Sequence, residues 1–159
     1  MATAYFSLGS NLGDREGNLK KALAELWKIN GVSVKKISSF YETEPVDVEG
    51  GEFVNCCVEA EVNEGMEARG LLRECLKIEK RMGRDRKKKN EARIIDIDLL
   101  LFGNERIDEK ELKIPHPEMK KRLFVLIPLQ EIAPGILIDG EKIDALIAKA
   151  EKKEVRKMR

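Results

Sequence analysis

Two aspartates lie two residues apart in the otherwise apolar stretch 94–102 of this 159-residue chain. In a β-strand, residues i and i+2 point to the same face, so we expect Asp96 and Asp98 to lie side by side, with Cα atoms about 6–7 Å apart. Burying two anions without a partner is costly, so a cation should meet them. Metal ions are the first candidates, and an ion-pair network with nearby arginine or lysine side chains is the alternative.

The segment just before this stretch, 84–93, carries six positive and two negative side chains. Neutralising two carboxylates does not require so many cations. Binding a polyanion that contacts both a metal ion and arginines does require them. Mg²⁺ usually takes one or two carboxylates and completes its octahedron with phosphate oxygens and water. The combination predicts a site for magnesium-bound nucleotide phosphates. Because these ten residues are mostly charged and have no apolar anchor, they also predict a lid that a polyanion orders.

Three further segments contain candidate functional residues. His116, the only histidine, stands between two prolines on a predicted stiff loop, from which it could donate a hydrogen bond to a phosphate. Asn55 follows Phe53 on a predicted strand, and an amide beside an aromatic ring could recognise a flat heterocycle; an ordinary surface strand is the alternative. Residues 9–13 lack the Gly-Lys-Ser/Thr ending of a phosphate-binding Walker A loop, which favours a tight strand-to-helix turn.

The hydrophobic periodicity predicts strands and helices in the order strand, helix, strand, strand, helix, strand. The predicted strands are 4–8, 32–41, 53–62 and 94–102; the predicted helices are one that Asp14 caps and Asn30 ends, then 67–82, 124–132 and 142–150. This order is the split βαβ plan of ferredoxin-like domains, an α+β layered sandwich with an antiparallel or mixed sheet flanked by helices. The length indicates one domain, residues 1–159.

Composition limits the classes of function. The chain has 30 Lys and Arg against 29 Asp and Glu, so affinity for phosphate must come from the local basic clusters 84–93 and 149–159. The three cysteines, Cys56, Cys57 and Cys75, lack zinc-site spacing and are interpreted as reduced, partly buried thiols of a cytosolic protein. No leader-like segment and no apolar run of membrane length occurs, so we expect a soluble, cytoplasmic protein that is not secreted.

Together these segments resemble one family. The matching motifs, in order and spacing, are 7–13, 40–46, 53–55, 83–86, 93–98, 102–105, 114–117 and 122–134. They resemble the 6-hydroxymethyl-7,8-dihydropterin pyrophosphokinase family of folate biosynthesis, and the resemblance covers nearly the whole chain. Arg-x-x-Asp-x-Asp followed downstream by Pro-His-Pro is specific in combination, whereas each motif alone is not.

The resemblance implies an enzyme that transfers pyrophosphate from ATP, its co-substrate, to the hydroxymethyl group of the dihydropterin and releases AMP. It implies that Asp96 and Asp98 hold two Mg²⁺ ions on the triphosphate. It further implies that Arg84, Arg93 and His116 contact phosphates or the reacting centre. These five residues are the predicted catalytic set. The sequence indicates no strong general base, so deprotonation of the alcohol by Asp96 and deprotonation assisted by magnesium both stay open.

The resemblance also implies contacts with the two substrates. The implied pterin contacts are hydrogen bonds from Thr43, Asn55 and the backbone of Val46, a contact with Asp96, and ring stacking by Phe53 and Phe124. The implied ATP contacts include Glu79, Leu99 and Leu112 near the adenosine, with Arg86, Lys89 and Arg122 as further contacts.

Two rival functions are weighed against this enzyme. A ferredoxin-like sheet could bind single-stranded RNA, but the predicted strands lack the aromatic pattern that stacks bases, and RNA binding has no use for Asp96 and Asp98. A catalytically inactive relative could serve as a partner module, but Asp96, Asp98 and His116 are intact. We therefore expect a monomeric enzyme whose partners are small molecules, without nucleic-acid or membrane partners.

Overall fold

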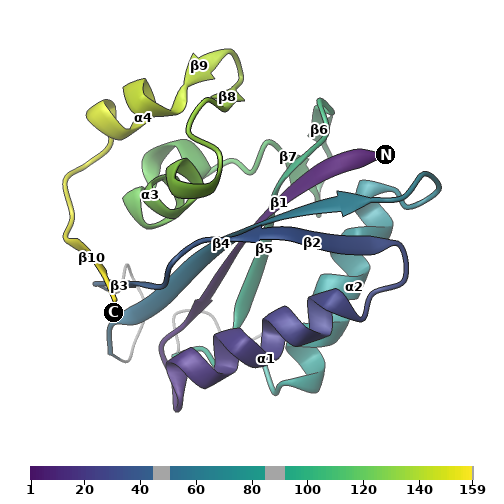
Figure 1. The fold of residues 1–159 in the computed structure, drawn as a ribbon, viewed down its shortest axis with the longest axis horizontal. Helices are drawn as coiled ribbons and strands as arrows, with labels where there is room; N and C mark the ends of the chain where they lie inside the picture. The colour runs from purple at the N-terminus through teal and green to yellow at the C-terminus, as the bar shows by residue number, and fades with distance from the viewer. Residues whose placement is uncertain (45–50, 85–91, 159) are drawn as a thin grey trace.

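The computed structural model of the protein describes residues 1–44, 51–84 and 92–158 (Figure 1). Three predicted binding residues, Val46, Arg86 and Lys89, lie outside the described residues, as does most of the segment 84–93 that was predicted to form a lid. No helix within the described ranges is long and apolar enough to cross a membrane.

An antiparallel sheet forms the centre of the fold (Figure 1). Its strands are β1 (Ala2–Ser10), β2 (Val32–Ile37), β3 (Tyr41–Thr43), β4 (Phe53–Val62), β5 (Asp96–Phe102) and β10 (Val155–Lys157). They lie in the order β10-β3-β4-β1-β5, and β2 also pairs with β4. Strand β1 lies between β4 and β5 and pairs antiparallel with both. This arrangement confirms the predicted α+β fold with a sheet flanked by helices.

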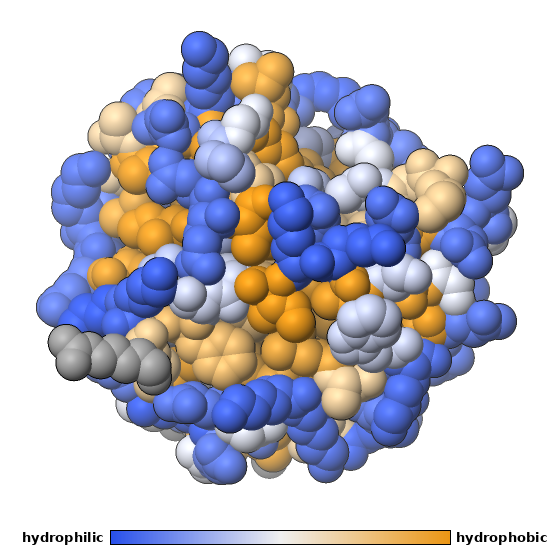
Figure 2. Space-filling view, viewed as in Figure 1, coloured by the Kyte–Doolittle hydropathy of each residue, from blue (hydrophilic) through white to orange (hydrophobic). Residues whose placement is uncertain are grey.

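Helices cover both faces of the sheet. On one face lie α1 (Arg15–Trp27) and α2 (Ala68–Arg81), and on the other lie α3 (Leu123–Ile132) and α4 (Ile143–Lys149) (Figure 1). Short elements connect them: β6 (Ile107–Asp108), β7 (Lys113–Ile114), a 3-10 turn (Met119–Lys121), β8 (Leu137–Ile138) and β9 (Glu141–Lys142). On the face shown in Figure 2, hydrophilic residues line the outer edge, and most of the apolar residues lie inside this edge.

Both long helices begin or end where the sequence predicts. The Asp14 carboxylate accepts a hydrogen bond from the Gly17 amide at 3.1 Å and so caps α1. At the end of α2, Gly83 takes φ +97° and the Arg84 amide donates to the Glu79 carbonyl at 2.9 Å. This is a glycine-dependent helix end, and it sets the direction in which the chain leaves toward the candidate site.

Four predictions about the strands need correction. The strand predicted over 32–41 is split into β2 and β3, because the Ser38 hydroxyl accepts a hydrogen bond from the Cys57 amide between them. Gly9 belongs to β1 and not to the following turn. The basic tail, predicted only as a charged cluster, contributes strand β10.

The fourth correction concerns β4, because the alternation of apolar and polar residues over 53–62 predicts a half-buried strand. Asn55 and Cys57, on the side predicted to be polar, are buried as well. The reason is α3, which packs over this side and accepts a hydrogen bond from the Cys57 thiol at the Val125 carbonyl, 3.4 Å away. All three cysteines are fully buried thiols and not partly buried ones, and burial raises the pKa of Cys56 to about 12.

Candidate active site

The candidate site begins as two rows of residues across the neighbouring strands β4, β1 and β5. Gly9 of β1 pairs with Asp96 of β5 on one side and with Asn55 of β4 on the other. Two residues earlier on β1, Ser7 pairs in the same way with Asp98. Because alternate residues of a strand share a face, all five lie on the face opposite α1 and α2. The predicted common face of the two aspartates is therefore confirmed.

These rows form the floor of a cavity of about 250 Å³. The cavity is lined by Ser7, Gly9, Thr43, Glu44, Phe53, Asn55, Arg84, Arg93, Asp96, Asp98, His116, Arg122 and Phe124. The structure thus brings together most of the residues that the sequence predicted, although they come from segments far apart in the chain. Ser7, Gly9 and Glu44 also line the cavity and were missed. A glycine inside a strand often marks a close approach of another group, but this signal was hidden for Gly9 because the sequence predicted it in the turn after the strand.

Asp96 lies between two arginines. Its carboxylate is 3.0 Å from Nε of Arg84 and 2.9 Å from a terminal nitrogen of Arg93. The side chain of Arg84 is only 7% exposed and that of Asp96 15%, so this group of charges is largely removed from water. The alternative of an ion-pair network, which the sequence left open, is therefore present at Asp96. The carboxylate of Asp96 and the guanidinium groups of Arg84 and Arg93 all line the cavity.

The backbone of Arg93 is fixed against the turn that follows β1. Its amide donates to the Asn11 side-chain oxygen at 2.6 Å, and its carbonyl accepts from the Asn11 amide at 3.0 Å. Nε of Arg93 is buried and has no hydrogen-bond partner among the described residues. A buried donor without a partner is costly, so an incoming acceptor at this point would gain a hydrogen bond that the protein alone does not form.

The amide of Asn55 is held in one orientation. Its nitrogen donates to the Thr43 hydroxyl at 2.8 Å, and both side chains are buried. Its oxygen lies above Gly9, so close that a Cβ on Gly9 would be 2.6 Å from it. Only glycine therefore fits beneath Asn55. The aromatic rings of Phe53 and Phe124 line the same part of the cavity, and together these groups offer a polar edge between flat apolar surfaces.

His116 and Arg122 supply further nitrogen donors. The His116 amide donates to the Leu100 carbonyl at 2.9 Å, which fixes the loop against β5. Nδ1 of its ring accepts a hydrogen bond from the Glu118 amide at 3.2 Å. A neutral imidazole whose Nδ1 accepts carries its hydrogen on Nε2, so Nε2 is a donor. The Arg122 guanidinium lies over the Phe124 ring, 5.6 Å from its centroid.

A second, larger cavity of about 570 Å³ adjoins the first. Asp98 and His116 line both cavities. Leu99 and Leu112, which were predicted to lie near an adenosine, line the second cavity together with Leu72 of α2. The two cavities thus place a mostly apolar compartment beside a strongly charged one.

Glu79 was also predicted to lie near the adenosine, but it lines neither cavity. It is 1% exposed, and its carboxylate accepts a hydrogen bond from the Ile97 amide at 2.7 Å. Its place in the sequence was the available signal, because Glu79 follows Cys75 by four residues on the apolar side of α2. The structure therefore assigns Glu79 a contact with the backbone of β5, between Asp96 and Asp98.

The described residues contain no group of three or more histidine, cysteine or acidic side chains that could hold a metal ion. The cavity instead offers the paired carboxylates of Asp96 and Asp98. This donor set fits Mg²⁺, which binds through one or two carboxylates and takes its other ligands from substrate phosphates and water.

Comparisons with known proteins agree with this geometry. Residues 5–134 match the family model described as 7,8-dihydro-6-hydroxymethylpterin-pyrophosphokinase. The chain is 43% identical over 134 residues to the 2-amino-4-hydroxy-6-hydroxymethyldihydropteridine pyrophosphokinase of Bacillus subtilis, covering 84% of this chain and 79% of that protein. It is 37% identical over 152 residues to the protein of the same name from Methylorubrum extorquens, covering 95% of each.

Solved structures show the same fold. The Plasmodium falciparum HPPK-DHPS structure with pteroate superimposes with a TM-score of 0.73 over 93% of this chain, at 15% sequence identity. This chain spans only 44% of that longer protein, so the likeness concerns the fold of one part of it. On the family match and the close relatives, the chain belongs to the 7,8-dihydro-6-hydroxymethylpterin-pyrophosphokinase family.

Proposed function

We propose that this protein transfers the pyrophosphoryl group of ATP to the hydroxymethyl group of 6-hydroxymethyl-7,8-dihydropterin in folate biosynthesis. The products are AMP and the pterin diphosphate. The reaction is that of the family to which the chain belongs. The observation that carries the proposal is the single cavity in which Asn55 and Thr43 lie on the same sheet face as Asp96 and Asp98.

The pterin occupies the part of the cavity formed by β3, β4 and α3. Asn55 and Thr43 hydrogen-bond the polar edge of the heterocycle, and Phe53 and Phe124 pack on its two faces. The buried hydrogen bond between Asn55 and Thr43, at 2.8 Å, supports this assignment because it presents a fixed amide to the ligand. Val46 is proposed to contribute a backbone hydrogen bond and lies outside the described residues.

The triphosphate occupies the charged part of the cavity. Arg84, Arg93 and His116 bind its oxygens, and Arg122 approaches from α3. The unpartnered Nε of Arg93 and the Nε2 donor of His116 support these roles. Arg86 and Lys89 are proposed as further phosphate ligands and lie outside the described residues.

Asp96 and Asp98 would hold two Mg²⁺ ions, and Asp96 is also proposed to contact the pterin. When bound, magnesium offsets negative charge on the phosphate oxygens. Arg84 and Arg93, which pair with Asp96 here, then turn their charge toward the polyphosphate. The carboxylate and the two arginines thus exchange partners as ATP enters the cavity.

The chemical step forms one bond and breaks one. The hydroxymethyl oxygen attacks the β-phosphorus and loses its proton, while the bond from the β-phosphorus to the oxygen that bridges it to the α-phosphorus breaks and AMP leaves. The residues of this chain position the two substrates in line and stabilise charge on the transferred group, chiefly through the guanidinium groups of Arg84 and Arg93. The choice of the β-phosphorus over the γ-phosphorus follows from family membership and not from the charges alone.

The adenosine is proposed to lie in the second cavity, against Leu99 and Leu112. Glu79 acts on this region indirectly, because it fixes the Ile97 amide of β5. A single domain over residues 1–159, a monomeric state and a cytoplasmic location stay predictions.

The distribution of cations disfavours an RNA-binding role for the tail, because Arg156 pairs there with Glu42 and Glu52. The decisive experiment is to separate nucleotide products by anion-exchange chromatography. We expect AMP and pterin diphosphate in equal amounts, dependent on both Mg²⁺ and the dihydropterin. ADP with a pterin monophosphate would contradict the proposal, and the absence of any pterin-dependent product would favour an inactive relative or a binding module.

A further inference from the structure

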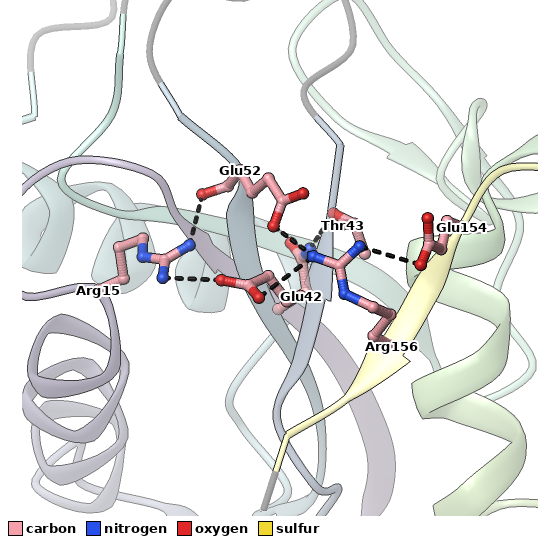
Figure 3. Close-up of polar contacts among 7 residues, drawn as sticks. Arg15, Glu42, Thr43, Glu52, Glu154 and Arg156 are labelled. Atoms are coloured by element: carbon pink, nitrogen blue, oxygen red, sulfur yellow. Dashed lines mark hydrogen bonds and ion pairs between the residues drawn. The ribbon is translucent and has the colours of Figure 1, made fainter.

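Outside the cavity, a cluster of charges joins the last strand of the sheet to its neighbours. Arg156 of β10 lies 3.2 Å from the Glu42 carboxylate, pairs with Glu52, and lies 3.1 Å from Glu154. Arg15, the first residue of α1, lies 2.8 Å from the other oxygen of Glu42 and donates to the Glu52 carbonyl at 2.9 Å. Figure 3 shows these side chains converging from α1, β3 and β10. The cluster therefore ties three separate segments together.

Two of the three glutamates that Arg156 binds each precede a residue that lines the cavity. Glu42 precedes Thr43 on β3, and Glu52 precedes Phe53 at the start of β4. Thr43 and Phe53 are also cross-strand partners in the sheet. Arg156 therefore acts on the backbone next to both members of one pair of cavity residues, without itself lining the cavity.

The strand that Arg156 supports is short and dependent on its neighbours. β3 has three residues and pairs with β4 on one side and β10 on the other. In the second ladder, Arg156 is the direct partner of Glu42 and Val155 that of Thr43. Adjacent residues of a strand point to opposite faces, so Glu42 faces the charged cluster while Thr43 faces the cavity. A shift of β3 would move the Thr43 hydroxyl that holds Asn55.

We infer that Arg156 is a positioning residue for pterin recognition. By holding Glu42 and Glu52, it fixes β3 against β4 so that Thr43 keeps the amide of Asn55 in the orientation the heterocycle requires. The basic tail thus serves the substrate site through ion pairs within the protein and not by binding phosphate. This inference rests on the proposed function.

The chemistry of the cluster requires arginine at this position. The planar guanidinium presents several donors in a rigid fork, and Arg156 uses two of its nitrogens to reach three carboxylates. A lysine ammonium keeps the charge but is a single point on a flexible chain, so it would hold fewer partners in place. Exposed ion pairs contribute little to folding. Loss of Arg156 should therefore affect the pterin pocket more than overall stability.

The test measures steady-state kinetics with one substrate saturating and the other varied. For Arg156→Met we expect the KM for the dihydropterin to rise about three- to tenfold, since exposed ion pairs have modest energies. The turnover number and the KM for ATP should stay close to those of the wild type. The KM of Arg156→Lys for the dihydropterin should lie between that of the wild type and that of Arg156→Met. Arg106→Met is the matched control, because it removes an exposed ion pair with Asp139 away from the cavity and should leave both KM values unchanged.

A second variant protects the test against misfolding. Glu52→Gln removes one partner and keeps Arg156, so it should raise the KM for the dihydropterin in the same direction, and the double variant should add less than the sum of the two effects. An unchanged KM for the dihydropterin, with only a lower melting temperature, would overturn the inference. An equal rise in both KM values would also overturn it. A wild-type protein without pterin-dependent AMP release would instead contradict the proposed function itself.

Discussion

The two faces of the central sheet are built from alternate residues of the same strands, yet they differ in chemistry. On one face, Leu8, Val54 and Ile97 are fully buried against α1 and α2. On the other, their neighbours Gly9, Asn55 and Asp96 line a charged cavity. A shift of one residue along a strand therefore separates the core from the candidate active site. Substitutions of Leu8 and Val54 should therefore change stability, and substitutions of Asn55 and Asp96 should change binding or catalysis. Ile97 also lines the second cavity, so its substitution should affect both.

The second face is itself divided. Near the middle of the strands, α3 covers it and buries Cys57 and Leu100 in a smaller apolar cluster. Toward the end of the strands, α3 supplies only Phe124 to the cavity, beside Arg122 at its start. The polar rows thus stay accessible to ligands where the helix does not cover them.

The largest effect is expected for Asp96→Asn. The substitution removes a charge held between Arg84 and Arg93 and a proposed metal ligand, so turnover should fall by on the order of 10³-fold or more. Circular dichroism should show a folded protein. Asp139→Asn is the matched control, because Asp139 also lies between two cations, Arg106 and Lys120, but far from the cavity. Near-normal turnover of Asp96→Asn would remove the catalytic role of this carboxylate.

The apolar face should respond in the opposite way. Leu8 is fully buried between the strands and the α1/α2 layer, and Leu8→Ala should lower the free energy of unfolding by about 3 kcal/mol through lost burial and a cavity. The KM values for both substrates should be preserved at a temperature where the variant is folded. Urea titration measures the first effect and kinetics the second. A large KM change without loss of stability would mean that the two faces are not separate in function.

Asn55→Ala should weaken pterin binding by about 1–3 kcal/mol, because a polar edge of the ligand and the Thr43 hydroxyl both lose a partner. The affinity for ATP should hardly change. Isothermal titration with each substrate separates the two effects. If ATP binding were weakened more than pterin binding, Asn55 would belong to the other half of the cavity.

The smallest effect is expected at Glu131, whose carboxylate joins α3 to Ser39 and to Tyr41 of β3. Burial alone would raise the pKa of Glu131, but hydrogen bonds from Tyr41 and from the amide and hydroxyl of Ser39 lower it below its ordinary value. A lowered pKa in the folded state stabilises the protein above the unfolded-state pKa, and this contribution disappears as pH falls through the folded-state pKa.

We therefore expect Glu131→Gln to lose about 0.5 kcal/mol of stability at pH 7, a small value because the carboxylate is exposed. The difference from the wild type should shrink as pH falls below about 4.5, where the unfolded carboxyl takes up its proton. Urea titrations at neutral and acidic pH measure it, with turnover as a control that should stay unchanged. A difference that grows in acid would contradict this sign.

Much of the fold was predictable because its long elements have clear periodicity. The bounds of β4 are those predicted, α2 is one residue shorter at each end than predicted, and Asp14 and Gly83 mark the helix ends. The strand β10 was not predictable, because its three residues have no apolar pattern and it forms only where the edge of β3 accepts it. Short strands in charged segments depend on tertiary contacts more than on their own residues.

The candidate site was likewise predictable from the sequence only in part. The common face of Asp96 and Asp98 follows from strand periodicity alone, whereas the role of Gly9 depends on the distance to a side chain of another strand. Glu79 adds a contact that the resemblance did not supply, since its carboxylate accepts a hydrogen bond from the Ile97 amide of β5. A buried carboxylate points toward a backbone amide that lacks another hydrogen-bond partner, and the sequence alone does not show which amide that is.

The comparison of the two faces is tested most directly at Leu8 and Asp98. Leu8 of β1 pairs with Ile97, the residue before Asp98 on β5, so Leu8 and Asp98 lie on opposite faces of the sheet. Turnover and the free energy of unfolding should be measured together for Leu8→Ala and Asp98→Asn. We expect Leu8→Ala to lose about 3 kcal/mol of stability and keep its turnover, and Asp98→Asn to keep its stability and lose about 10³-fold in turnover. Asp98→Asn with wild-type turnover would contradict the account.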